Sequence, residues 1–433
     1  MTTIENLYAF YLLHPSIATD TRKINNGDIF FALKGPSFNG NQFAAQALEA
    51  GASMAVVDEV EYAIDEQYFL VEDVLTALQA LAKYHRQQFN IPFIAITGSN
   101  GKTTTKELVS TVLSSVYITY TTQGNLNNHI GVPLTILQIK KDAQMAVIEM
   151  GANHQKEIAS YCEYTLPTHG LITNVGKAHL EGFGGEEGVK KGKGELFDFL
   201  RTNNGIAFAC DDFDYFAEMT KGLEEIHWYG TKMGETIGHV IESEPFLEAS
   251  VGNGLAEFVI HTKLVGAYNI YNVLAAVTIG KYFNVPNEKI KSAIENYTPS
   301  NSRSQMIEKD GNHIILDAYN ANPSSMAAAI ENFAALPAEN KMLFLGAMME
   351  LGPQSIAEHE NLIELIGKYQ WKSVVLVGGD FNHVFHPYQY FDTSKQAAEW
   401  WQALHSKGNY LLIKGSRSVK MEEILNRPPV SGE

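Results

Sequence analysis

The feature that most constrains this chain is an apolar segment, Phe93–Thr97, that runs directly into a glycine-rich turn and then into a helical pattern from Thr103 to Ser115. A strand, a glycine-rich turn and a helix in this order present backbone N–H groups and a helix N-terminus to phosphates. Lys102 is expected to reach the β- and γ-phosphates, and the Thr103 hydroxyl to bind Mg²⁺. The pattern predicts an ATP site formed by Gly98, Ser99, Asn100, Gly101, Lys102, Thr103 and Thr104.

This segment departs from the strict phosphate-loop pattern at one position. The pattern G-x-x-x-x-G-K-[ST] requires glycine at position 96, where this chain has Ile96. A chance Gly-Lys-Thr in an unrelated turn is the alternative interpretation. The apolar strand before the turn and the helix after it favour the phosphate loop.

The order of predicted elements indicates an α/β protein of three domains within the 433 residues. Residues 1–85 read as a small mixed α/β domain, residues 86–299 as a central phosphate-loop domain with a mostly parallel sheet, and residues 300–433 as a Rossmann-like domain. A turn-rich stretch at 298–302 is the expected hinge. The main predicted strands are Asp28–Leu33, Ala52–Val57, Phe93–Thr97, Met145–Met150, Gly170–Val175, Ile206–Cys210, His313–Ala318, Lys341–Ala347, Ser373–Gly378 and Tyr410–Lys414.

Charge and cysteine content restrict the partners and the compartment. The net charge of −17 argues against nucleic acid and against an anionic membrane surface, so anionic small molecules must be bound by local donors. Two cysteines form no disulfide framework, which fits a reducing cytoplasm. We expect no signal peptide and no membrane insertion, because the basic and long apolar segments that these need are missing.

Three side chains of the central section are candidate groups around a metal ion. Glu149 ends a predicted strand, where open α/β sheets bind ligands, although a surface glutamate is an equally good interpretation. His179 follows another strand end, which favours a ligand over a structural histidine. Lys193 lies among other charged residues of a predicted helix, and composition alone favours a solvated helix face for it.

Longer motifs carry a resemblance to a known family. Thr19-Asp20-Thr21-Arg22, the short loop Thr97–Lys106, Asp317–Pro323, Gly346–Gly352 and Lys414-Gly415-Ser416-Arg417 are similar to motifs of the Mur ligases of bacterial cell-wall synthesis. The resemblance extends over nearly the whole chain, and the short loop with Ile96 is the family's own form. The stretch Gly124–Leu134 is similar to the subgroup that adds D-alanyl-D-alanine to a UDP-linked muramoyl tripeptide.

The resemblance implies an ADP-forming ligase of the cytoplasm, mostly monomeric in the family, that works through an acyl phosphate. Its implied substrates are ATP, UDP-N-acetylmuramoyl-tripeptide and D-Ala-D-Ala, with Mg²⁺ as cofactor; residues 1–85 would bind uridine and residues 300–433 would close over ATP. Another Mur ligase or a folylpolyglutamate synthase-like ligase is one alternative. A phosphate-loop switch that binds nucleotide without ligation is another.

The resemblance also implies roles for individual residues. Glu149 and His179 match Mg²⁺ ligands, and Lys193 aligns with a lysine that is carbamylated in several members. A carbamate requires a neutral amine, and hence a depressed lysine pKa. Asn272 matches an adenine contact, and Arg303 and Asp317 match nucleotide contacts made as the last domain closes. The implied substrate-binding residues are Thr21, Arg22, Asn125, Asn127, Asn128, Tyr319, Asn320, Asn322, Lys414, Ser416 and Arg417.

Several positions differ from the family pattern or allow a second interpretation. Tyr268 replaces the usual histidine before the adenine site, Ser302 the usual glycine before Arg303, and Asn39-Gly40-Asn41 the usual Asp-Gly-His. The asparagines near the substrate could equally stabilise turns, a common role for asparagine. The sequence leaves open whether the third residue of the peptide is diaminopimelate or lysine.

Overall fold

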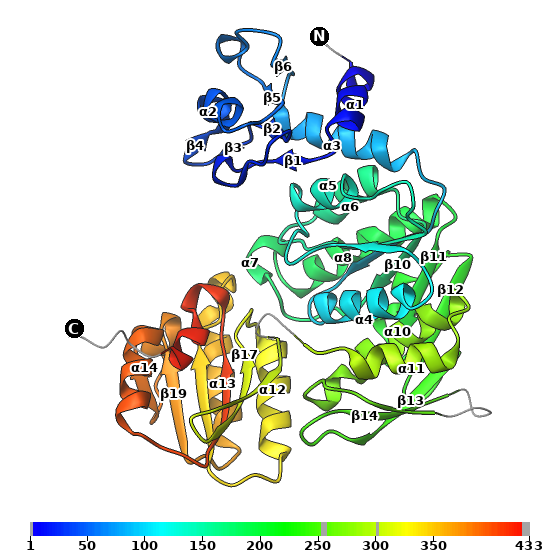
Figure 1. Ribbon diagram of the computed structural model, residues 1–433. Helices are drawn as coiled ribbons and strands as arrows, with labels where there is room; N and C mark the ends of the chain where they lie inside the picture. Colours follow the sequence, from blue (N-terminus) through cyan, green and yellow to red (C-terminus); the bar gives the residue numbers. More distant parts are fainter. Residues whose placement is uncertain (1–2, 253–257, 300–302, 427–433) are drawn as a thin grey trace.

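The computed structural model describes residues 3–252, 258–299 and 303–426, so part of the predicted hinge, residues 300–302, lies outside the described residues. Three α/β units follow one another along the chain (Figure 1), built on sheets of four, nine and six strands among the described residues. The predicted three-part α/β architecture is confirmed.

The first unit is a parallel sheet between two helical layers. Strand β2 (Ile29–Phe31) pairs with β5 (Met54–Val57), and successive side chains of a strand point to opposite faces. Phe30 therefore packs with the alanines of α2 (Ala44–Glu49), whereas Ile29 and Phe31 belong to the core that includes α3 (Val74–Arg86). The other elements are α1 (Ile4–Leu13), β1 (Ile17–Ala18), the hairpin β3 (Lys34–Gly35) and β4 (Phe38–Asn39), and β6 (Tyr68–Leu70).

The central sheet has the order β15-β14-β13-β12-β11-β10-β7-β9-β8 among the described residues. Strand β7 (Phe93–Thr97) lies between β9 (Met145–Glu149) and β10 (His169–Ile172), parallel to both and fully buried. Because parallel strands end at the same edge, the turns after these three strands meet there. Helices α4 (Lys102–Ser114), α10 (Ile270–Tyr282) and α11 (Asn287–Asn296) pack together, and α6 (Glu157–Thr165) packs with α8 (Glu186–Thr202) and α3.

The antiparallel edge of this sheet was not predicted. Strand β13 (Thr236–Glu242) pairs antiparallel with β14 (Glu248–Gly252), which pairs antiparallel with β15 (Phe258–His261). These strands mix buried and exposed residues. They therefore lack the continuous apolar runs that predict buried parallel strands. The remaining elements are β8 (Thr119–Thr121), α5 (Gly131–Ile136), α7 (Leu180–Phe183), β11 (Ile206–Cys210), α9 (Tyr215–Met219) and β12 (Glu225–Gly230).

The last unit is a Rossmann-like sheet with the order β16-β17-β21-β18-β19-β20. Strands β17 (Asn312–Asp317) and β16 (Gln305–Lys309) form an antiparallel hairpin whose turn, Asp310-Gly311, has positive φ at both residues (51° and 76°), a geometry that matches the twist of the strands. The other pairs are parallel. They involve β18 (Lys341–Gly346), β19 (Ser373–Val377), β20 (Gln389–Phe391) and β21 (Tyr410–Lys414), with helices α12 (Pro323–Ala335), α13 (Ser355–Gly367) and α14 (Ser394–Ala403).

A buried histidine of the central sheet makes stability depend on pH. Burial lowers the pKa of His169, on β10, from 6.5 to about 4. Between these pH values the unfolded chain binds a proton there that the folded chain does not, so stability falls as the pH falls. At about 1.4 kcal/mol per pKa unit, we expect a loss of about 3 kcal/mol over this range.

Thermal unfolding of the wild type and of His169→Gln between pH 7 and pH 4 measures this effect. The variant should lose less stability on acidification than the wild type. The matched control is His239→Gln, which removes an exposed histidine of the same sheet and should leave the pH dependence unchanged. Equal acid sensitivity of the wild type and His169→Gln would contradict the prediction.

Within the described residues, no helix is both long and apolar enough to cross a membrane.

Candidate active site

The phosphate loop joins β7 to α4 and depends on two glycines. Gly98 has φ +141°, and a Cβ there would lie 2.0 Å from the Thr173 hydroxyl oxygen. Gly101 has φ +78°, and a Cβ there would lie 2.6 Å from Oδ1 of Asn272. Both positions need glycine for its backbone conformation and for space. Ile96, by contrast, is a fully buried residue within β7, so position 96 belongs to the strand and not to the turn.

Asn174, which follows β10, holds the loop in place and was not predicted as a site residue. The Ser99 N–H donates to the Asn174 carbonyl at 2.9 Å, and the Asn100 N–H donates to its side-chain oxygen at 3.0 Å. The Asn174 side-chain amide in turn donates to the Asn100 carbonyl at 3.0 Å. The only sequence signal for this role is a polar residue just after a buried strand.

Lys102 points back into the loop. Its Nζ donates to the Gly98 carbonyl at 2.7 Å and to the Ser99 carbonyl at 3.1 Å. Burial lowers the Lys102 pKa to about 8; nearby Glu149 opposes this shift, and Arg303 adds to it. An ammonium group held by neutral carbonyls in a buried loop is well placed to gain a phosphate as its counter-ion.

Glu149, the last residue of β9, is placed next to the loop by the strand register, which pairs it with Ile96. Its carboxylate is 1% exposed and accepts hydrogen bonds from the Thr103 hydroxyl at 2.8 Å and from the Asn127 side-chain amide at 2.7 Å. No ion pair of Glu149 occurs among the described residues. A buried carboxylate that forms no direct ion pair is a good environment for a cation.

Lys193 is fully buried in α8 and is not on a solvated helix face. Its Nζ donates to the Ala152 carbonyl at 3.0 Å and lies 4.8 Å from the centre of the Phe183 ring. Burial, and secondly the positive charge of Lys102, holds the Lys193 pKa well below its usual range. A lowered pKa favours the neutral amine, which is the form from which a carbamate can form.

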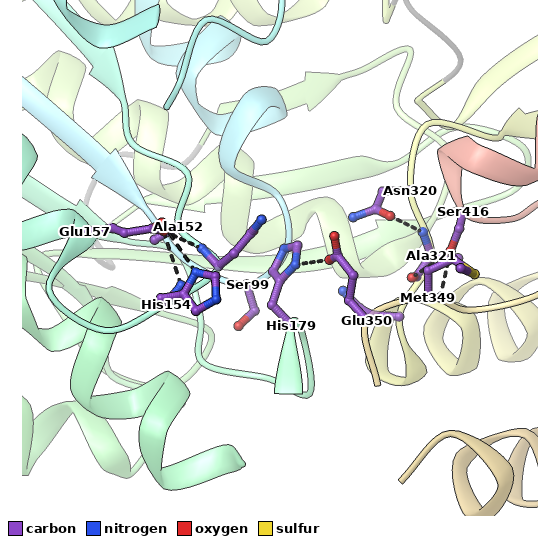
Figure 2. Close-up of polar contacts among 12 residues, drawn as sticks. Ser99, Ala152, His154, Glu157, His179, Asn320, Ala321, Met349, Glu350 and Ser416 are labelled. Atoms are coloured by element: carbon purple, nitrogen blue, oxygen red, sulfur yellow. Dashed lines mark hydrogen bonds and ion pairs between the residues drawn. The ribbon is translucent and has the colours of Figure 1, made fainter. Parts of the chain in front are cut away.

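His179 contacts the last unit. Its Nδ1 meets a carboxylate oxygen of Glu350 (Figure 2), and this contact lowers the pKa of Glu350. The Glu350 carbonyl also accepts a hydrogen bond from the Glu181 N–H at 3.3 Å. Glu350 belongs to the family motif Gly346–Gly352, but no role was predicted for it. Among the described residues, no three His, Cys, Asp or Glu side chains group to hold a metal ion, so the predicted metal site depends on Thr103 and on a carbamate at Lys193 as well.

A cavity of about 750 Å³ lies between the central and last units. Asn272 lines the cavity next to Gly101. Its Oδ1 accepts a hydrogen bond from the Thr105 hydroxyl at 3.0 Å, and its side-chain amide donates a hydrogen bond to the Asn269 side-chain oxygen at 2.8 Å. The predicted site residues that line the cavity are Ser99, Asn100, Gly101, Lys102, Thr103, Thr104, Asn127, Asn128, Glu149, His179, Asn272, Arg303, Asp317, Tyr319, Asn320, Asn322 and Lys414.

The wall from the last unit is docked onto the phosphate loop. The Asn322 amide donates to the Asn100 side-chain oxygen at 2.8 Å, and Lys414, almost fully buried, pairs with Asp317. Further along the interface, Lys177 forms an ion pair of 2.6 Å with Glu358 of α13. Neither Lys177 nor Glu358 belongs to a motif that indicates this contact.

Seven predicted residues do not line the cavity. Gly98 and Lys193 are buried outside the lining of the cavity, and Asn125 is exposed. Ser416 is buried and accepts a hydrogen bond from the Met349 N–H at 3.1 Å (Figure 2), so it joins two turns of the last unit. The others are Arg417, an exposed residue whose guanidinium lies 5.4 Å from the Tyr319 ring, and Thr21 and Arg22 of the first unit, where Arg22 pairs with Asp20.

The fold and the cavity define a phosphate-loop α/β protein whose last unit forms one wall of the cavity beside the loop. Family models agree with this class along most of the chain. The Mur ligase family, catalytic domain, matches residues 15–86; the Mur ligase middle domain matches residues 96–280; and the Mur ligase glutamate ligase domain matches residues 302–417.

Relatives and solved structures agree with the family models. The UDP-N-acetylmuramoyl-tripeptide–D-alanyl-D-alanine ligases of Bacillus subtilis and Escherichia coli are 33% and 34% identical, over 94% and 95% of this chain and 92% of each relative. A MurF structure from Acinetobacter baumannii has a TM-score of 0.85 at 32% identity, over 94% of this chain and 92% of that one. A MurF structure from Thermotoga maritima in complex with ADP has a TM-score of 0.85 at 27% identity, over 96% and 97%. The chain belongs to the Mur ligase family.

Proposed function

We propose that the protein is an ATP-dependent ligase that joins D-alanyl-D-alanine to UDP-N-acetylmuramoyl-tripeptide. The observation that carries the proposal is the cavity in which the phosphate loop faces the Asp317–Asn322 segment of the last unit. Both segments carry family motifs, and relatives with this activity in their names match over more than nine-tenths of the chain. A nucleotide switch without ligation would not need the second wall.

The chemistry follows from the poor reactivity of a carboxylate, whose leaving group would be oxide. The terminal carboxylate of the tripeptide attacks the γ-phosphorus of ATP, ADP leaves, and an acyl phosphate forms. The amine of D-Ala-D-Ala then attacks the acyl carbon, loses a proton, and expels inorganic phosphate as the amide forms. Lys102 would neutralise charge on the transferring phosphoryl oxygens, while the docked last unit excludes water that would hydrolyse the intermediate.

The residues present fit a Mg²⁺ ion. Thr103 and Glu149 offer hard oxygen donors, and the Glu149 carboxylate is buried without a cationic partner among the described residues. Thr103, Glu149, His179 and a carbamate on Lys193 would hold the metal. When bound, it would supply positive charge to the phosphate groups.

The remaining assignments concern the substrates and the setting of the reaction. We assign uridine to residues 1–85 with Thr21 and Arg22, ATP to residues 86–299 with Asn272, and closure to residues 300–433. We assign the binding of the dipeptide and of the peptide groups to Asn125, Asn127, Asn128, Tyr319, Asn320, Asn322, Lys414, Ser416 and Arg417. The enzyme would act as a monomer, as the family resemblance implies, and in the cytoplasm, where two free and buried cysteines fit a reducing environment.

Phosphate release against a panel of substrates tests this function. With ATP, Mg²⁺ and UDP-N-acetylmuramoyl-tripeptide, we expect release to rise at least about tenfold on addition of D-Ala-D-Ala, because the acyl phosphate turns over only when the correct amine attacks it. L-Ala, D-Glu and meso-diaminopimelate are the matched controls. Equal release with all four amines would refute the dipeptide assignment, and tripeptides with diaminopimelate or lysine would identify the third residue.

A further inference from the structure

Tyr268 connects the nucleotide site to the first described residues of the last unit. It lies in a short 3₁₀ turn, Ala267–Asn269, just before α10, and its ring covers Gly266, where a Cβ would come within 2.4 Å of the ring. Its hydroxyl lies 3.1 Å from the hydroxyl of Ser304. Tyr268 is also the position at which this chain departs from the family's histidine.

Ser304 in turn contacts Asp317, which belongs to the wall of the cavity. Its backbone has φ +47°, a left-handed conformation that a serine keeps only when neighbours hold it there. Its N–H donates to one carboxylate oxygen of Asp317 at 3.1 Å, and the other oxygen accepts from Lys414. Tyr268, Ser304, Asp317 and Lys414 all line the cavity, so a continuous polar chain runs from the central unit into the last one.

This chain of contacts orients the guanidinium of Arg303, the residue before Ser304. Its guanidinium stacks on the Tyr319 ring, 3.6 Å from the ring centre, and lines the cavity. Its Nε is buried and has no hydrogen-bond partner among the described residues. A buried, unpaired guanidinium nitrogen is costly unless an acceptor is supplied, and the phosphates of a nucleotide would supply one. The backbone of Ser304 therefore determines where this donor points.

We propose that Tyr268 is a positioning residue of the ligase reaction: its hydroxyl holds Ser304, which sets Arg303 and Asp317 against the bound nucleotide in the docked state. The inference rests on the proposed ATP-dependent function. Burial, and secondly the Asp317 carboxylate, raises the pKa of Tyr268, so the hydroxyl stays neutral and can donate at physiological pH.

The test is Tyr268→Phe, which keeps the ring and removes only the hydroxyl. We expect the KM for ATP and the dissociation constant for ADP, measured by calorimetry, to rise about 3- to 10-fold, the range for one lost hydrogen bond. The KM for the UDP-tripeptide and the melting temperature should stay unchanged. Tyr282→Phe is the matched control, because it removes a hydroxyl at the far end of α10 that contacts His169.

A double-mutant cycle makes the test specific to the Tyr268–Ser304 contact. Ser304→Ala should reproduce the effect, and Tyr268→Phe/Ser304→Ala should be no worse than either single variant, because both changes remove the same contact. Unchanged nucleotide affinity in Tyr268→Phe, or additive effects in the cycle, would overturn the proposal. The ADP measurement needs no turnover, so it remains decisive even if the wild type fails to use D-Ala-D-Ala, a result that would refute only the ligase function.

Discussion

Replacing Lys102 with methionine should lower kcat/KM for ATP by about 10²- to 10³-fold, the effect of removing one preorganised donor that stabilises charge in a transition state. Methionine keeps most of the length of the lysine side chain without its charge. Phosphate release at saturating UDP-tripeptide and D-Ala-D-Ala, over a range of ATP concentrations, measures the loss.

Stability separates this loss from misfolding. At pH 7 Lys102 is charged although burial has lowered its pKa to about 8, so the folded protein bears the cost of a desolvated ammonium group. Removing the charge should therefore leave the melting temperature unchanged or raise it. A variant that melts like the wild type and keeps full activity with ATP would show that Lys102 is not the phosphate-binding lysine.

Lys193→Ala should reduce activity by at least about 10²-fold, and short carboxylic acids such as acetate should restore part of it. The reason is that a carbamate on Lys193 would supply a carboxylate-like ligand, which a small acid can replace in the space left by the side chain. Steady-state phosphate release with and without added acetate measures both effects.

The same helix offers the control for this experiment. Lys190 lies one turn before Lys193, is paired with Glu218 on the surface, and can be changed to alanine with little expected effect. Because Lys193 is fully buried, Lys193→Met serves as a second variant that keeps the packing, and it should be inactive without rescue. Full activity of Lys193→Ala, with no response to acetate, would rule out carbamylation.

The fold was predictable where elements are long and buried. Strands β7, β11 and β21 have the bounds that the sequence pattern predicts, because continuous apolar runs are local signals. The antiparallel edge β13–β15 was missed, since its mixed polar and apolar residues acquire a pattern only when paired with neighbours. A one-sided strand of this kind is recognised through its partner and not through its own composition.

The candidate site shows the same division between local and tertiary information. The loop Gly98–Thr103 was evident from one stretch of sequence, because its glycines and lysine act within a single turn. The burial of Lys193 was not, since its neighbours in the helix are charged and only the packing of α8 against the residues around Ala152 removes it from water. The contact of His179 with Glu350 joins residues 171 positions apart, so no local pattern could indicate it.

By itself, the sequence determined the family, the phosphate loop and the order of the three α/β units, because each rests on motifs or periodicities that are contiguous in the chain. Only the tertiary structure decided which predicted residues face a common cavity, that the Glu149 carboxylate is buried and accepts a hydrogen bond from Thr103, and that Tyr268 meets Ser304. These properties depend on desolvation and on distances between segments far apart in the chain. They arise when the strand ends of the central sheet and the wall of the last unit come together.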